Sequence, residues 1–179
     1  MGSVIRGIRL LFSPRYLLAT NTASCATLLA VGDALEQIIS IRLCADRARN
    51  YDLARTARVG LTGVLLGPMN HFWYRFLDAR FKGRTLAQLI AKVIIDFSSC
   101  PIFSATFITS CAVLEGQSGL EAIREYRSKF KTILTLDMCV WPPSQAFNFW
   151  LLPAQARVIY ICTVQVFYNA AITYIKHEV

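Results

Sequence analysis

DMCVWPPSQAFNFWLLPAQAR, the stretch from Asp137 to Arg157, decides the fold of this chain. It is apolar enough to lie in a membrane, yet it contains three prolines and is interrupted by an Asp, two Gln, an Asn and an Arg. A proline removes a backbone donor, and in a membrane the freed backbone groups need partners inside the protein. The stretch therefore predicts a kinked or broken helix within a membrane bundle. Either a full crossing or a partly re-entrant segment over residues 133–152 fits this pattern.

The composition of the chain is that of a membrane protein. Of its 179 residues, 55% are hydrophobic and 17% are charged, whereas soluble domains are about 25% charged. The apolar residues form long runs, and basic residues lie at the flanks of these runs. Lys and Arg at such flanks set membrane topology and contact anionic headgroups. We therefore attribute the net charge of +8 to basic residues that flank membrane segments rather than to a nucleic-acid-binding patch. No direct DNA binding is expected.

The chain divides into a short basic segment and one membrane domain. Residues 1–16 form a basic N-terminal lead without acidic residues. This lead resembles a mitochondrial leader, and it fits the basic flank of a first membrane helix equally well. Residues 17–179 are expected to form a single integral membrane helical domain with the lipid bilayer as its surroundings.

The apolar runs predict an all-α, multi-spanning membrane helix bundle. About four transmembrane helices are expected, over residues 17–41, 59–77, 85–114 and 154–175. Residues 119–132 have the pattern of an amphipathic helix, which leads into the proline-broken segment. Gly63 and Gly67, four residues apart, predict the close approach of another helix.

Ionisable side chains inside these runs are the candidate functional residues, because charges facing lipid are unfavourable. The candidates are Asp33, Lys92, Asp96 and Asp137. We predict that they either line a pore or form a buried polar network. Lys92 and Asp96 have the i, i+4 spacing that allows a pair on one helix. Glu36 and Gln37, near the end of the first run, are expected at the level of the headgroups.

The prolines and the remaining polar residues suggest a structural hinge. Trp141, Pro142 and Pro143 are expected to end the amphipathic helix, and Pro153 to start the last one. Gln145 and Asn148 are expected to bond freed backbone groups or neighbouring helices. Arg157 is expected to contact Asp137 or an anionic headgroup. His71 is interpreted as a hydrogen-bonded packing histidine.

Patterns typical of enzymes are missing from the sequence. It has no glycine-rich phosphate loop, no G-x-S-x-G and no metal-ligand spacing, and its six cysteines show no C-x-x-C. With only two histidines, acid–base chemistry would depend on carboxylates or tyrosines within the membrane. We expect no enzymatic activity, no cofactor and no metal.

The stretch quoted first also carries a resemblance to a known family. Its pattern W-P-x-x-Q-x-x-N-F-x-x-x-P-x-x-x-R is similar to the C-terminal motif of the Mpv-seventeen/peroxisomal membrane protein family. A G-P-x-x-H-x-W-Y element and a K-x-x-x-D element with a later proline resemble further motifs of that family. The matching positions are Gly67, Pro68, His71, Trp73, Lys92, Asp96, Trp141, Pro142, Gln145, Asn148, Phe149, Pro153 and Arg157.

The resemblance implies a small helical protein of the mitochondrial inner membrane, with the peroxisomal membrane as the alternative, that supports organelle homeostasis. One implied function is a membrane scaffold for mitochondrial ribosome assembly and translation, with ribosome components as partners of the basic connectors. A second is a channel for ions or small solutes. A third is a peroxisomal protein that affects reactive oxygen metabolism. A homo-oligomer is compatible with each function.

Overall fold

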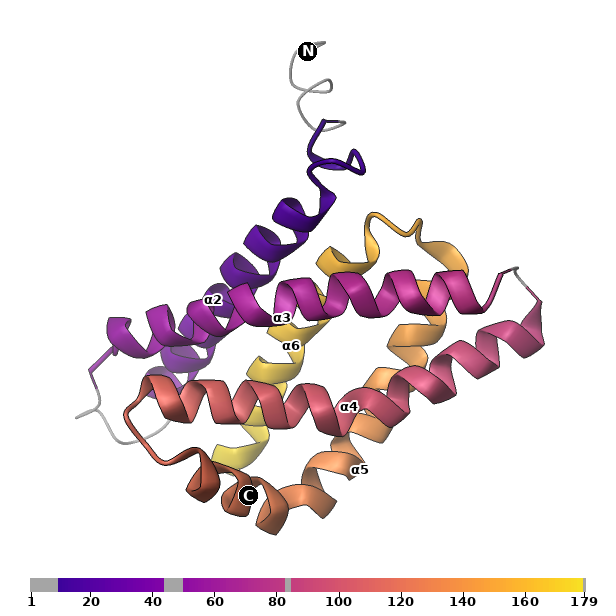
Figure 1. Ribbon diagram of the computed structural model, residues 1–179. Helices are drawn as coiled ribbons and strands as arrows, with labels where there is room; N and C mark the ends of the chain where they lie inside the picture. The colour runs from indigo at the N-terminus through magenta and orange to yellow at the C-terminus, as the bar shows by residue number, and fades with distance from the viewer. Residues whose placement is uncertain (1–9, 44–49, 83–84, 179) are drawn as a thin grey trace.

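The computed structural model describes residues 10–43, 50–82 and 85–178. They form five helices, α2 (Leu17–Leu43), α3 (Leu53–Arg80), α4 (Leu86–Leu114), α5 (Gly119–Leu151) and α6 (Arg157–Glu178). Figure 1 shows them as a helical bundle, and the described part of the chain contains no strand. The all-α prediction is therefore confirmed. Most of the basic lead, residues 1–9, lies outside the described residues.

Two of the described helices are long and apolar enough to cross a membrane. They are α2, over Leu17–Arg42, and α4, over Leu86–Leu114. The crossing of the membrane by four helices stays a prediction. The distribution of polarity supports a membrane environment, because large apolar side chains such as Phe72, Ile94 and Trp150 are more than half exposed. Many polar and charged side chains are buried beside the apolar core, as expected where lipid surrounds the bundle.

The predicted break at the prolines is wrong. α5 continues through Pro142 and Pro143 to Leu151, so the amphipathic segment is the first part of this helix. The chain changes direction later, over residues 152–156, and α6 begins at Arg157. A proline disturbs one turn, but neighbouring helices can hold the turns on either side of it. In α5 those turns are held by side-chain hydrogen bonds to α3, α4 and α6.

α3 begins six residues before the predicted start at Val59. Asp52 caps the helix, and its carboxylate accepts a hydrogen bond from the Arg55 backbone N–H at 2.9 Å. An Asp in this position satisfies one of the unpaired donors of the first turn. The cap places Arg55 and Arg58 on a helix rather than in an extended connector.

The predicted close approach at Gly63 and Gly67 is confirmed. A Cβ atom on Gly63 would lie 2.5 Å from the Cα of Ala26, and one on Gly67 would lie 2.6 Å from the Cα of Thr22. Both neighbours are backbone atoms of α2, so α2 and α3 pack with their backbones in contact. α2 also packs against α6, and α4 packs against α5. The apolar core lies between α2, α3 and α6, with Phe149 of α5 as an additional member.

Candidate functional site

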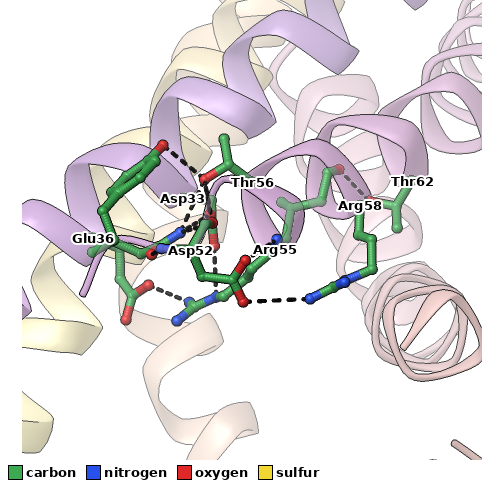
Figure 2. Close-up of polar contacts among 10 residues, drawn as sticks. Asp33, Glu36, Asp52, Arg55, Thr56, Arg58 and Thr62 are labelled. Atoms are coloured by element: carbon green, nitrogen blue, oxygen red, sulfur yellow. Dashed lines mark hydrogen bonds and ion pairs between the residues drawn. The ribbon is translucent and has the colours of Figure 1, made fainter. Parts of the chain in front are cut away.

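A buried polar cluster joins the C-terminal half of α2 to the start of α3. Asp33 is 4% exposed. Its Oδ1 lies 2.9 Å from Nε of Arg55, and its Oδ2 accepts hydrogen bonds from Thr56 at 2.7 Å and from Gln37 at 2.8 Å. Gln37 also accepts the backbone N–H of Asp52 at 2.7 Å. We call Asp33, Gln37, Asp52, Arg55 and Thr56 the Asp33 cluster. Figure 2 shows its labelled members, Asp33, Asp52, Arg55 and Thr56, converging between the two helices.

This geometry corrects the expectation for Gln37. Its side chain is buried within the Asp33 cluster rather than at the headgroup level. Glu36 is only partly buried, and it forms an ion pair with Arg55. A buried carboxylate that meets a cation and two neutral donors is well satisfied. The contacts of Asp33 are therefore those of a structural connection between α2 and α3.

The first connector, the basic segment over residues 42–58, has fewer unpaired cations among its described residues than its sequence indicates. Arg55 is engaged by Asp33 and Glu36, and Arg58 lies 3.5 Å from the carboxylate of Asp52. Of the other three arginines in this connector, Arg42 lies in the last turn of α2, and Arg47 and Arg49 lie outside the described residues. Contact between these arginines and ribosomal RNA stays a prediction, and no described contact favours it.

A second charged cluster lies where α3 ends and α4 and α6 begin. Asp78 of α3 lies 2.8 Å from Nζ of Lys92 in α4 and also forms an ion pair with Arg157 of α6. The side chains of both cations are 9% exposed. Nζ of Lys92 and Cζ of Arg157 lie 5.6 Å and 5.3 Å from the centre of the Phe149 ring. We call Asp78, Lys92 and Arg157 the Asp78 triad.

The triad corrects two sequence-based expectations. Lys92 pairs with Asp78 rather than with Asp96, and Arg157 pairs with Asp78 rather than with Asp137. The sequence offers Lys92 a partner one turn away, but the hairpin of α3 and α4 brings Asp78 within reach of its flexible side chain. The sequence motifs do not select Asp78 as a candidate residue. Its only signal in the sequence is that it is the sole acid in the basic stretch 75–84.

We predict that Asp78→Asn lowers the free energy of unfolding by about 2 kcal/mol. Removing one partner of a buried ion pair costs roughly 3–5 kcal/mol, and the 28% exposure of the Asp78 side chain lets water reduce that cost. Unfolding by SDS in mixed micelles would measure the change. Glu121→Gln, at an exposed position, is the matched control. Equal stability of both variants would contradict the structural role of the triad.

Asp96 lies at the centre of a third network, and this network contains several residues of the sequence motifs. Its Oδ1 accepts the indole N–H of Trp73 at 2.8 Å, and its Oδ2 accepts an N–H of Gln145 at 2.6 Å. The same nitrogen of Gln145 contacts the hydroxyl of Tyr74 at 2.9 Å. Asn148 is fully buried, and its side-chain N–H donates to Oε1 of the Gln145 side chain at 2.8 Å. Gln145 and Asn148 thus bond neighbouring side chains rather than freed backbone.

The side chain of Asp137 in α5 connects this helix to α6. Its Oδ1 accepts hydrogen bonds from the indole of Trp141 at 2.9 Å and from the hydroxyl of Tyr168 at 2.8 Å. The rings of these two donors lie 5.4 Å apart. Neither of these hydrogen bonds engages Oδ2 of Asp137. The residue as a whole is 5% exposed.

A pocket of about 400 Å³ lies between the five described helices. Asp96 and Asp137 both line it, together with Gln145, Tyr74 and Tyr168. Asp33 and Lys92 do not belong to its lining. Of the four ionisable residues selected from the sequence, the structure thus brings two together at one pocket and assigns the other two to separate ion-pair clusters.

Comparison with known proteins identifies the family. The model of the Mpv17 / PMP22 family matches residues 112–173. Protein SYM1 of Gibberella zeae is 30% identical over 99% of this chain and 100% of its own length. The chain belongs to the Mpv17/PMP22 family. This is the Mpv-seventeen/peroxisomal membrane protein family that the sequence motifs resemble.

Two further members of the Mpv17/PMP22 family are similar along most of their length. PXMP2/4 family protein 2 of Dictyostelium discoideum is 26% identical over 90% of this chain and 85% of its own. Mitochondrial inner membrane protein Mpv17 of Caenorhabditis briggsae is 28% identical over 88% of this chain and 84% of its own. No solved structure is significantly similar to the chain.

The structure gives the remaining Mpv17/PMP22 motif residues different local environments. His71 is buried, and its Nδ1 lies 2.9 Å from the side-chain nitrogen of Asn21, a partner that the sequence did not indicate. Pro68 and Pro142 lie inside helices, and Pro153 lies in the turn before α6. No group of three His, Cys, Asp or Glu side chains able to hold a metal occurs in the described residues.

Proposed function

We propose that this chain is an integral protein of the mitochondrial inner membrane that conducts small polar solutes or ions through the pocket at Asp96 and Asp137. The location is supported by a relative that is named a mitochondrial inner membrane protein. Fractionation of organelles would test it, and recovery in peroxisomal membranes would favour the alternative location.

The pocket is the observation that carries the proposed conduction. Its lining comes from all five described helices, so it lies within the bundle rather than on one helix face. Carboxylate, amide and hydroxyl groups line it among aromatic and aliphatic side chains. Ionisable residues inside membrane bundles typically face such cavities and mark solute or ion pathways. The Asp33 cluster and the Asp78 triad would stabilise the helices around this path.

The proposal is tested by conductance of the purified chain in planar bilayers. We predict that Asp96→Asn and Asp137→Asn each reduce the selectivity for cations over anions, because each removes a negative charge from the pocket wall. Glu121→Gln, outside the pocket and exposed, should leave selectivity unchanged.

Two results would contradict this function. One is the absence of conductance in bilayers that contain folded protein. The other is a conductance whose selectivity is unchanged by both pocket substitutions.

A further inference from the structure

The charged side chains that line the pocket are all acidic. Asp96 and Asp137 contribute carboxylates, and no Lys, Arg or His belongs to the lining. The buried cations nearest in the fold, Lys92 and Arg157, are engaged by Asp78 outside the pocket. An occupant of this pocket would therefore experience an unbalanced negative field.

The apolar part of the pocket wall is rich in aromatic rings. Five aromatic side chains contribute to the lining, namely Tyr74, Phe103, Phe107, Trp141 and Tyr168. The faces of aromatic rings attract cations, and ligand cations bind to such faces with particular strength when water is excluded. The rings and the carboxylates thus favour the same sign of charge.

Asp137 has capacity left for a ligand, whereas Asp96 does not. Both oxygens of Asp96 accept hydrogen bonds from side chains of the protein. In Asp137 a single oxygen, Oδ1, accepts both hydrogen bonds, and neither of them engages Oδ2. Because Asp137 lines the pocket, its Oδ2 can accept a hydrogen bond from an occupant or contact a cationic group there.

The lining favours an organic cation over a metal ion. Calcium and magnesium require about six or more oxygen ligands in a compact shell. The described residues contain no group of three or more acidic, His or Cys side chains that could hold a metal ion, and most of the pocket wall is carbon. A volume of about 400 Å³ also lies within the range of small-molecule sites.

We infer that the pocket binds a small organic ammonium ion, with its cationic group between Asp137 Oδ2 and the rings of Trp141 and Tyr168. This inference concerns the pocket used in the proposed function and names the class of its occupant. Asp96 contributes a second negative charge on the wall. The aliphatic part of the ligand contacts the phenylalanine rings.

The test compares two probes of the same shape on the purified chain in a nonionic maltoside detergent. Choline carries a trimethylammonium group. Its uncharged analogue 3,3-dimethyl-1-butanol, called dimethylbutanol below, carries a tert-butyl group in that place. Isothermal titration is expected to give an affinity for choline about tenfold above that for dimethylbutanol, because only choline gains the charge interactions. Asp137→Asn is expected to lower the affinity for choline about tenfold and to leave that for dimethylbutanol unchanged.

Control variants separate the role of charge from that of folding. Asp137→Glu retains the charge and should retain the preference for choline, while Glu121→Gln should bind both probes as the unaltered chain does. Trp141→Leu keeps the wall apolar but removes a ring from beside the cationic group, so it should weaken choline alone. If Asp137→Asn does not fold, the two probes on the unaltered chain and on Trp141→Leu decide the question.

Equal affinities of the unaltered chain for choline and dimethylbutanol would overturn the inference, and so would choline binding that Asp137→Asn leaves intact. These outcomes are independent of conduction. A chain that discriminates between the probes but conducts nothing would contradict the proposed function and support the ammonium site.

Discussion

Replacing Gly63 by alanine is expected to lower the free energy of unfolding by about 3 kcal/mol, the upper end of the range for added methyl groups in packed interiors. The new methyl group would lie 2.5 Å from Cα and 2.7 Å from N of Ala26. Both atoms belong to the backbone of α2, so no side-chain rotation can make room. The two helices would have to separate, and in membranes close packing of this kind drives helix association.

The loss should extend beyond the glycine contact, because the Asp33 cluster joins the same two helices. Unfolding by SDS in mixed micelles and the amount of protein accumulated in the membrane would measure the effect. Gly119→Ala is the matched control, since its methyl group would meet the end of the Thr109 side chain at 3.3 Å. Similar stabilities of the two variants would contradict the packing of α2 against α3.

Replacing Arg55 by alanine is expected to lower the free energy of unfolding by about 3 kcal/mol, the lower end of the range for a buried ion pair that loses one partner. The Asp33 side chain is 3% exposed, whereas that of Arg55 is 34% exposed. Removal of the cation therefore leaves a carboxylate that water cannot reach. Thr56 and Gln37 still donate to it, but neither supplies a compensating charge.

Arg58→Ala serves as the control within the same helix. Its partner Asp52 has a side chain that is 52% exposed, and the two charged groups are 3.5 Å apart. Exposed pairs of this kind contribute about 0–1 kcal/mol. The same SDS titration should therefore separate the two arginines by about 2 kcal/mol or more. Equal losses would show that Asp33 does not depend on Arg55.

The helical class and the glycine contact were predictable because they depend on local pattern. Long apolar runs have few alternatives to helices in a membrane, and small residues four apart form a groove on one helix face. Asp33, which the sequence singles out as a charge inside the first apolar run, is likewise buried.

The prolines and the charge partners were not predictable in the same way. Pro142 and Pro143 remain inside α5, because bonds from Asp137 and Gln145 to other helices hold the turns on either side. Lys92 has Asp96 one turn away along its own helix, yet Asp78 of α3 is its partner. Sequence spacing reports only neighbours within one helix.

The amino-acid sequence by itself determined an all-helical membrane protein, its membership of the Mpv17/PMP22 family and the glycine face of α3. Only the tertiary structure decided which partner each buried charge meets. It also decided that Asp96 and Asp137 share one pocket while Asp33 and Lys92 do not. The physical reason is that a buried charge requires compensation at distances of a few ångströms, and the packing of separate helices sets those distances.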